Sequence, residues 1–294
     1  MTSTLPTGPK RFAITASDRY MGVFQAFIDC GWEPVKLFTA PIDSHMASNQ
    51  KVVELAQSRN IPIQLSRMGE HDMLGLKDLG CDLLVVASYQ WKIGNWEKYL
   101  PRAVNFHPAP LPDYRGAYPL IQGLLDRRTQ WAFTCHKVAP NFDSGDILAA
   151  EEFPISADEC HESLDIKSQL ASKRLATRVA RDLDALWDGA CVQGTGNYVK
   201  LWTDADREID FNASADSIGL QLRAFGNFEC MASLNGMRYF VRRAVCWTEA
   251  HGYSPGTVVH IDGLHYVVAC KDGYVTLLDW SLIPPGMKIY ATFR

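Results

Sequence analysis

Apolar residues in the first half of the chain gather in short runs that alternate with segments of helical spacing. Runs at residues 11–16, 34–40, 61–65 and 81–88 have the apolar character of strands. Between them, residues 21–28 and 52–60 place apolar side chains every three or four positions, as amphipathic helices do. Strands separated by helices pair in parallel, and uninterrupted apolar runs are typical of strands covered on both faces. The pattern predicts an α/β fold with a doubly wound, mostly parallel sheet.

The pattern changes after residue 155. Residues 156–187 predict one long helix, with Ser156 as its N-cap and Glu159 completing a capping box. The Gly-containing segment 188–197 predicts a linker. After a helix at 213–225, apolar and polar residues alternate at period two between turns, which indicates a small antiparallel sheet or open barrel. We therefore expect one domain over residues 1–195 and a smaller β-rich domain over 205–294.

Composition narrows the class of protein. The 294 residues are 47% hydrophobic and 21% charged, which is a globular composition. The 29 Lys and Arg against 33 Asp and Glu give a formal charge of -4, so there is no global basic field to hold nucleic acid. No apolar run approaches the ~20 residues that a membrane-spanning helix needs. The polar first ten residues do not resemble a secretory signal and predict a frayed terminus.

The eight cysteines form no CxxC pair, so their spacing predicts neither a zinc site nor a redox pair. Free, mostly buried thiols in a reducing compartment are the interpretation that suits a chain of this length. Together with the absence of a signal, this predicts a cytoplasmic protein without a metal or a membrane partner.

Three polar residues between positions 104 and 148 suggest chemistry. Asn105 and His107 are two residues apart on a predicted strand end, so their side chains share a face. Prolines then end the strand, and Asp143 follows a second predicted strand, in a loop. Each residue also has a structural interpretation: a strand cap for Asn105, a satisfied loop histidine for His107 and an Asx turn for Asp143.

The same segment resembles a known family. NFHPAPLPDYRGAYPL and FDSGDIL are similar to the motifs of the formyltransferases that use 10-formyltetrahydrofolate, most closely the methionyl-tRNA formyltransferase-like branch. The resemblance is weaker but continuous beyond them, and QLRAF at 221–225 with the following strands is similar to the family's C-terminal open barrel. It implies that the domain over 1–195 is the catalytic formyltransferase domain.

The resemblance implies an N-formyltransferase in which a primary amine attacks the formyl carbon and a tetrahedral oxyanion forms. Asn105 would donate a hydrogen bond to that oxygen, and His107 would move a proton. Asp143 would pair with His107, raise its pKa and fix its orientation. His136 has no counterpart in the motif and is interpreted as structural, and Asp146 as a loop-shaping carboxylate.

The resemblance also implies where the substrates bind. The donor, 10-formyltetrahydrofolate, is expected on the loop after the strand at 81–88 and on the loop at 139–143, through Ser88, Tyr89, Gln90, Trp91, Lys92, Ile93, Ala139, Pro140, Asn141 and Phe142. The acceptor is expected near Tyr114, Arg115, Gly116 and Tyr118. Each of three of these residues also has an alternative interpretation: Trp91 as a packing aromatic, Arg115 as a structural residue and Gly116 as the residue of a backbone turn.

The distribution of basic residues along the chain indicates which class of acceptor to expect. Formyltransferases of tRNA carry a basic insertion after the second strand, whereas residues 39–50 here contain no Lys or Arg, nor does 188–197. Arg242 and Arg243 are neighbours on one strand and are expected to face opposite sides, which makes a poor phosphate track. We therefore favour a small or nucleotide-linked amine over methionyl-tRNA, which stays an alternative.

Two other functions remain open from the sequence: a catalytically silent folate-binding or interaction protein, and hydrolysis of the formyl donor. GNFECM at 226–231 departs from the prolines usual in the family and puts conventional substrate binding by the second domain in doubt. The sequence does not indicate an oligomeric state.

Overall fold

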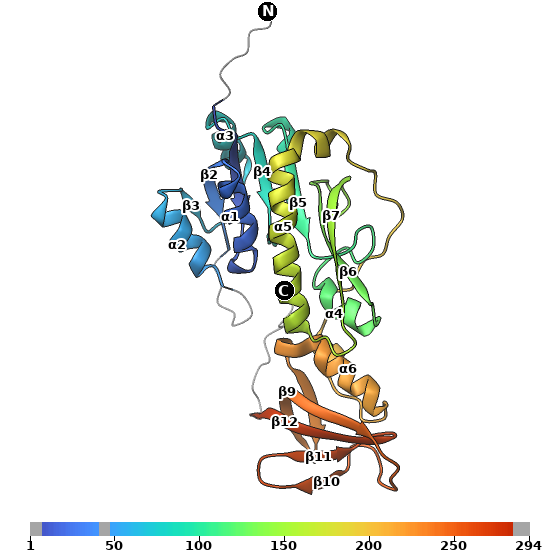
Figure 1. Cartoon of the computed structure of the whole chain (residues 1–294). Coiled ribbons are helices and arrows are strands. Elements are labelled where there is room, and N and C mark those ends of the chain that lie inside the picture. The colour runs from blue at the N-terminus through green and yellow to red at the C-terminus, as the bar shows by residue number, and fades with distance from the viewer. Residues whose placement is uncertain (1–7, 41–47, 285–294) are drawn as a thin grey trace, which may run out of the picture. The chain divides into compact units, whose positions relative to one another are not determined.

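The computed structural model describes residues 8–40 and 48–284, which form two compact units (Figure 1). The first unit contains the described residues up to Gly116, together with Gln130–Pro154 and Ile166–Tyr198. The second contains Ala117–Thr129, Ile155–Asp165 and the described residues from Val199 onward. The expectations for residues 1–7, and for 41–47 within the stretch without Lys or Arg, lie outside the described residues.

A seven-stranded mixed sheet, in the order β3-β2-β1-β4-β5-β6-β7, organises the first unit. The pairs from β3 through β5 are parallel, and β6 and β7 are antiparallel additions at one edge. The predicted mostly parallel α/β sheet is thus confirmed. The strands are β1 Arg11–Thr15, β2 Glu33–Phe38, β3 Ile63–Gln64, β4 Leu83–Val86, β5 Ala103–His107, β6 Gln130–Lys137 and β7 Ile147–Pro154.

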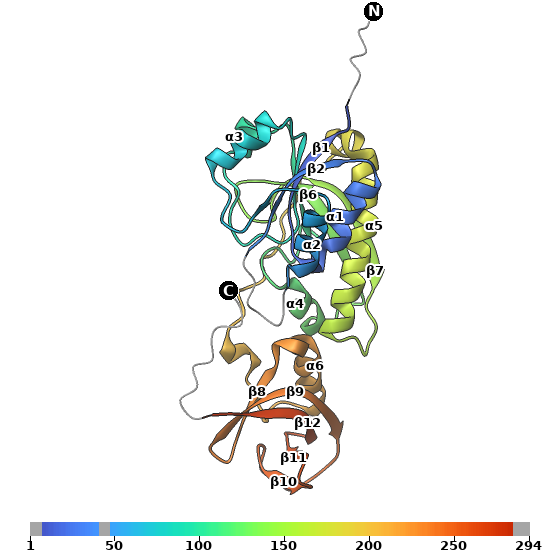
Figure 2. The same ribbon diagram turned by 90° about the vertical axis from the view of Figure 1, so that its left-hand side faces the viewer.

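Helices cover both faces of this sheet (Figures 1 and 2). Side chains alternate across β1, so Phe12 packs against Phe27 of one helix while Ala13 joins a cluster on the other face. The helices are α1 Met21–Asp29, α2 Gln50–Ser58, α3 Glu70–Asp78 and α5 His161–Asp188, with short 3-10 turns at Asp18–Tyr20 and Trp96–Lys98.

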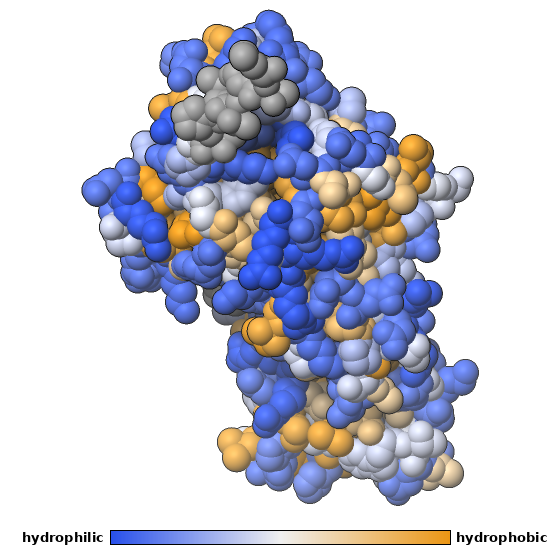
Figure 3. All heavy atoms as spheres, turned by 45° about the horizontal axis from the view of Figure 1, so that its top comes forward, coloured by the Kyte–Doolittle hydropathy of each residue, from blue (hydrophilic) through white to orange (hydrophobic). Residues whose placement is uncertain are grey.

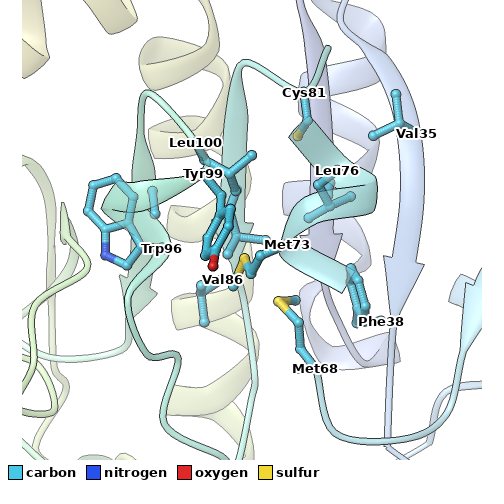
Figure 4. Packing of buried hydrophobic residues seen from close by; sticks show 13 residues of the cluster. Val35, Phe38, Met68, Met73, Leu76, Cys81, Val86, Trp96, Tyr99 and Leu100 are labelled. Carbon is cyan, nitrogen blue, oxygen red and sulfur yellow. The ribbon is translucent and has the colours of Figure 1, made fainter. Parts of the chain in front are cut away.

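The cluster around α3 holds the end of β4 in place (Figure 4). Met73 and Leu76 from α3 and Val86 from β4 are buried together with aromatic residues from 96–100. Tyr89 and Ile93 pack against the same cluster from the loop that follows β4. Apolar packing therefore fixes the start of a loop that the sequence associates with donor binding.

Helix α5 begins later than predicted. It starts at His161, because Ser156 and Glu159 close a separate turn instead of a capping box on the helix. The backbone N–H of Ser156 donates to Glu159 Oε2 at 3.1 Å, and the N–H of Glu159 donates to the Ser156 carbonyl at 3.1 Å. A capping-box pattern and such a turn use the same two residues, so the sequence does not distinguish them.

The segment 188–197 is not the free linker that its glycines suggest. Cys191 and Ile147 exchange two backbone hydrogen bonds of 2.8 and 2.9 Å, and the Arg115 N–H donates to the Asn197 carbonyl at 3.1 Å. A Cβ on Gly196 would lie 1.9 Å from the Pro112 carbonyl oxygen, so the glycine permits a close backbone contact. This part of the chain is built into the first unit.

The second unit contains a five-stranded antiparallel sheet in the order β10-β11-β12-β9-β8, as the period-two pattern predicts. Its strands are β8 Cys230–Leu234, β9 Met237–Thr248, β10 Val258–Ile261, β11 Tyr266–Ala269 and β12 Gly273–Ile283. Its helices are α4 Pro119–Leu125 and α6 Ala215–Phe225, with 3-10 turns at Asp204–Arg207 and Gly226–Phe228. Ser214 caps α6 by accepting the Ser217 N–H at 3.1 Å.

An irregular pairing of β9 with β12 overturns the expectation for two arginines. The register shifts on both sides of Asp279, opposite Arg242 and Arg243. Both arginines are exposed, both line one cavity of about 700 Å³, and both lower the pKa of Asp279, so both lie near the same carboxylate. A bulge breaks strict alternation, so two neighbouring side chains can serve one face.

None of the helices in the described ranges is long and apolar enough to cross a membrane. On the face shown in Figure 3, hydrophobic side chains lie in patches separated by hydrophilic ones.

Candidate active site

Asn105 and His107 lie at the carboxyl end of β5, between a parallel and an antiparallel neighbour. Val86 of β4 is opposite Asn105 on one side, and His136 of β6 is opposite it on the other. His107 is buried, at 5% exposure, and Asn105 is half-buried. The period of the strand aims both side chains at the same region, as predicted.

Asp143 meets these two side chains from the loop between β6 and β7. Its backbone adopts φ 53°, in the left-handed region, and the residue is buried, at 9% exposure. The Asn105 amide donates to Oδ1 at 3.1 Å, and His107 Nδ1 lies 3.5 Å from the same oxygen. The Gly116 N–H donates to Oδ2 at 2.9 Å. The structure thus brings together the three residues that the sequence singles out.

His136 is a fourth member of this cluster, and its interpretation as a merely structural residue is incomplete. Its Nδ1 is 2.7 Å from the Lys137 carbonyl, which can only accept, so Nδ1 carries the hydrogen of this contact. Nε2 is then an acceptor, and the Asn105 amide nitrogen lies 2.9 Å away. Asp143 Oδ1 is 3.6 Å from the same Nε2. Pairing between β5 and β6 creates this contact, and only knowledge of that register could have revealed it.

Electrostatics give Asp143 and His107 different protonation states. Burial raises the pKa of the Asp143 carboxyl, but His107, His136 and the Gly116 N–H outweigh it and lower the pKa to about 2. Burial also lowers the pKa of His107, and this outweighs the opposing charge of Asp143. The predicted rise in the His107 pKa is therefore wrong, because desolvation of the imidazolium exceeds the attraction of one carboxylate. Near neutral pH, Asp143 is ionised and His107 is neutral.

Tyr114 holds the other side of the His107 ring. His107 Nε2 lies 3.0 Å from the Tyr114 carbonyl and donates its hydrogen there, which leaves Nδ1 as the basic nitrogen beside Asp143. The Tyr114 ring is buried against Trp131, with ring centroids 4.8 Å apart. Tyr114 therefore contributes to this cluster through its backbone.

Arg115 is tied to the segment that the sequence takes for a linker. Its guanidinium donates to Gln193 Oε1 at 2.8 and 3.1 Å and to the Gly194 carbonyl at 3.1 Å. The Gln193 amide in turn donates to the carbonyls of Asp143 and Gly145. Gln193 thus braces the Asp143 loop, a role for which the sequence carries no recognisable signal. Arg115 could contact the acceptor or have a structural role, and the contacts seen here are the structural ones.

The remaining residues expected near the acceptor differ in position. Gly116 adopts φ 96°, so it makes the backbone turn left open by the sequence and also binds Asp143. Tyr118 belongs to the second unit, where it precedes α4 and packs edge-on against Phe228 at 5.4 Å.

The two loops expected to hold the donor lie next to each other. Because β4 and β5 are parallel neighbours, the loop that starts at Ser88 leaves the same edge of the sheet as Asn105. Lys92 Nζ lies 5.4 Å from the ring centroid of Phe142, which joins this loop to 139–143. The Phe142 ring is 47% exposed, so a flat apolar surface is available beside the site.

Individual residues of these loops have different surroundings. The Tyr89 hydroxyl accepts the Met68 N–H at 2.7 Å, and its ring packs against Trp91 at 5.1 Å, so both aromatics have packing roles. Lys92 and Ile93 line a cavity of about 220 Å³. Ser88, Gln90, Pro140 and Asn141 are exposed, and Ala139 is half-buried.

Comparison with known proteins agrees with these observations. Residues 42–179 match the model of a family described as formyl transferase, and residues 202–289 match its C-terminal domain. Methionyl-tRNA formyltransferase of Hahella chejuensis is 25% identical over 90% of this chain and 86% of its own length. The Anaplasma marginale protein of that name is 28% identical over 83% of this chain and 79% of its own.

Solved structures share the fold. One is an N-formyltransferase from Helicobacter canadensis in complex with folinic acid and dTDP-3-aminofucose. It aligns with a TM-score of 0.66 at 13% identity, and the alignment covers 93% of this chain and 100% of that chain. A 4-N formyltransferase from Francisella tularensis aligns with a TM-score of 0.65 at 20% identity, over 82% of this chain and 99% of that one.

Proposed function

This chain belongs to the formyltransferase family, and on that premise we propose that it transfers a formyl group from 10-formyltetrahydrofolate to a primary amine of a small or nucleotide-linked substrate. The observation that carries the proposal is the cluster of Asn105, His107 and His136 around Asp143. An amide donor, a neutral imidazole and an ionised carboxylate are the groups that acyl transfer to an amine requires.

The two adjoining loops suit the donor. A folate presents a flat ring edged with donors and acceptors, and here an exposed Phe142 ring stands beside loop backbone. The donor supplies the formyl carbon, and the loops at 88–93 and 139–143 would hold and orient it. Folinic acid in the Helicobacter canadensis protein and tetrahydrofolic acid in Aquifex aeolicus HypX support this choice of ligand.

Asn105 is placed to stabilise negative charge on the formyl oxygen. Its amide nitrogen now lies within hydrogen-bond distance of both Asp143 and His136. One of these contacts must yield for the amide to donate to a substrate oxygen, a change that is common when a catalytic site binds its ligand.

His107 is placed to move the proton. Nδ1 of the neutral ring can accept a proton from the attacking amine, and Asp143 lies 3.5 Å away to stabilise the imidazolium that results. Because Asp143 is held ionised, it serves as the counter-charge and does not become the proton carrier.

Two observations support a nucleotide-linked amine as the acceptor: the lack of basic residues in one stretch of the chain and the ligand of a similar structure. The structure in complex with dTDP-3-aminofucose supports a nucleotide-linked amine, and residues 39–50 carry no Lys or Arg for a tRNA. Methionyl-tRNA is the second candidate, since the sequence relatives named above are methionyl-tRNA formyltransferases. The shared position of Arg242 and Arg243 also removes one argument against it.

A release assay separates these functions. The purified protein is given 10-formyltetrahydrofolate with dTDP-linked aminosugars, small amines or methionyl-tRNA, and tetrahydrofolate is measured. Release that requires one of the first two classes supports the proposal, whereas release that requires methionyl-tRNA supports the second candidate. Release without any amine would indicate hydrolysis, and no release from folded protein would indicate a silent binding protein.

His107→Ala provides the matching mutational test. We expect turnover to fall by about two to four orders of magnitude, because the proton acceptor is lost. His260→Ala is the matched control, since His260 is exposed on β10 of the other unit. Full activity in His107→Ala would remove His107 from the mechanism.

A further inference from the structure

The Tyr114 carbonyl, which accepts the hydrogen of His107 Nε2, belongs to a backbone in an unfavourable conformation. Tyr114 adopts φ 60°, in the left-handed region that bulky side chains rarely occupy. A residue keeps such a conformation only where its surroundings over-determine it. The contact between the buried Tyr114 ring and Trp131 fixes the side chain, but it does not fix the two peptide planes that flank the Cα. Other contacts must hold those planes.

Asn197 bonds to both peptide planes. Its side-chain Oδ1 accepts the Tyr114 N–H, and its backbone carbonyl accepts the Arg115 N–H at 3.1 Å. The N–H and C=O of one planar trans peptide point in opposite directions, so the second bond turns the Tyr114 carbonyl away from Asn197 and toward His107. With one bond on each plane, the backbone angles of Tyr114 are set by a residue 83 positions further along the chain.

The chain around Asn197 is built to reach this loop. Gly196 passes so close to the Pro112 carbonyl that no other residue type fits there, and this brings the next residue beside Tyr114. On the other side, Tyr198 forms a parallel bridge with Arg115. The Asn197 side chain itself is exposed, so it does not fill the core. Its contribution is the hydrogen bond, and a substitution can remove that bond without opening a cavity.

The place of the Tyr114 carbonyl decides between two forms of the neutral His107 ring. A hydrogen on Nε2 bonds to this carbonyl at 3.0 Å, whereas a hydrogen on Nδ1 would face Asp143 Oδ1 at 3.5 Å. The second distance exceeds the usual range of about 2.7–3.2 Å, and the same oxygen already accepts the Asn105 amide. The hydrogen therefore stays on Nε2 while the carbonyl stays in place. If the carbonyl moves away, the carboxylate becomes the better acceptor and the hydrogen shifts to Nδ1.

We propose that Asn197 is a positioning residue: it holds the Tyr114 carbonyl against His107 and thereby keeps Nδ1 of the neutral ring free to accept a proton. As the amine nitrogen forms its bond to the formyl carbon, it releases a proton, and Nδ1 can take that proton only if it carries no hydrogen of its own. The effect of Asn197 on the rate rests on the proposed function. Its effect on the place of the ring hydrogen does not.

Nitrogen-15 NMR of the imidazole rings tests this in the full chain at neutral pH, without substrate. Long-range proton–nitrogen correlation distinguishes a ring with hydrogen on Nε2 from one with hydrogen on Nδ1, and the His107 signals are those missing from His107→Ala. We expect Nε2–H in the natural protein and in Thr195→Val, an exposed control in the same segment. Asn197→Leu, of similar size but without an acceptor, should shift His107 largely to Nδ1–H. Asn197→Asp keeps the acceptor and should retain Nε2–H.

The release assay adds the effect on catalysis. Asn197→Leu should lower kcat by about 10-fold or more, as a wrong imidazole tautomer does, with a smaller change in the KM for the donor, and Asn197→Asp should recover most of the rate. The proposal is overturned if the natural protein carries its hydrogen on Nδ1, if Asn197→Leu keeps it on Nε2, or if the two Asn197 variants lose rate equally. If the natural protein releases no tetrahydrofolate, the proposed function fails, and the NMR comparison alone then confirms or overturns the role of Asn197.

Discussion

At the scale of single residues, the ionisation of Asp143 determines the charge beside His107 in the candidate active site. Buried carboxyls normally resist ionisation, yet this one is surrounded by an amide, a backbone N–H and two imidazoles. Burial raises its pKa, but His107, His136 and the Gly116 N–H outweigh burial and lower the pKa to about 2, which keeps a negative charge beside His107. Because burial lowers the pKa of His107, that ring is neutral and ready to accept a proton near pH 7.

The depressed pKa of Asp143 makes a prediction for stability. A carboxyl whose pKa falls from 3.8 in the unfolded chain to about 2 in the fold contributes stability that is present above pH 4 and lost as the pH falls to 2. We expect that loss to be about 2 kcal/mol in the free energy of unfolding. Urea denaturation from pH 5 to 2 should show it in the natural protein and in Asp113→Asn, an exposed control, but not in Asp143→Asn. An unchanged pH dependence in Asp143→Asn would contradict the assignment.

His136 makes a prediction for catalysis as a positioning residue. His136→Phe removes the acceptor for the Asn105 amide, which leaves a donor less firmly placed. We expect kcat to fall by about 10-fold or more, in line with ~1–3 kcal/mol for an unsatisfied buried polar group. The KM for the donor should change less than kcat, and His136→Gln, which keeps an acceptor, should restore part of the rate. Equal losses in both variants would indicate a packing role only.

At the scale of elements, segment 188–197 acts as a brace. Gln193 holds the Asp143 loop, and Gly196 allows the chain to pass against Pro112. From the sequence alone its glycines predict a flexible linker, because a glycine in a linker and a glycine at a close backbone contact look alike in one sequence. The distinction depends on what lies opposite each glycine in the fold.

Two glycines of this segment form a matched pair for a test. In Gly196→Ala the new methyl group would overlap the Pro112 carbonyl, whereas at Gly194 a Cβ has no neighbour within 4 Å. We expect Gly196→Ala to lower the free energy of unfolding by about 1–3 kcal/mol and to reduce turnover. Gly194→Ala should change neither, and thermal melting with the release assay measures both. Equal stability of the two variants would contradict the brace.

At the scale of the whole molecule, the two compact units do not follow the chain order. Residues 117–129 and 155–165 belong to the second unit, although they precede its other residues in sequence. Helix α4 comes from the first of these stretches and packs with α6. The domain boundary expected between residues 195 and 205 remains a prediction. The second domain that it defines, 205–294, does not include these two segments.

A fragment experiment follows from this organisation. Residues 205–294 alone lack α4, so one face of α6 loses its apolar neighbour. We expect that fragment to melt at a lower temperature than a fusion of the same residues with 117–129, with a broader transition. Circular dichroism on heating measures both. A fragment that melts as sharply and as late as the fusion would show that α4 is dispensable.

The sequence by itself determined the α/β fold, the antiparallel second sheet, the family and the grouping of Asn105, His107 and Asp143. Periodicity and a contiguous motif carry that information, because both depend on neighbours along the chain. Only the tertiary structure decided the place of His136, the brace by Gln193, the lowered pKa of His107 and the shared cavity of Arg242 and Arg243. Each of these depends on strand register, on a bulge or on burial, which arise from contacts between residues far apart in sequence.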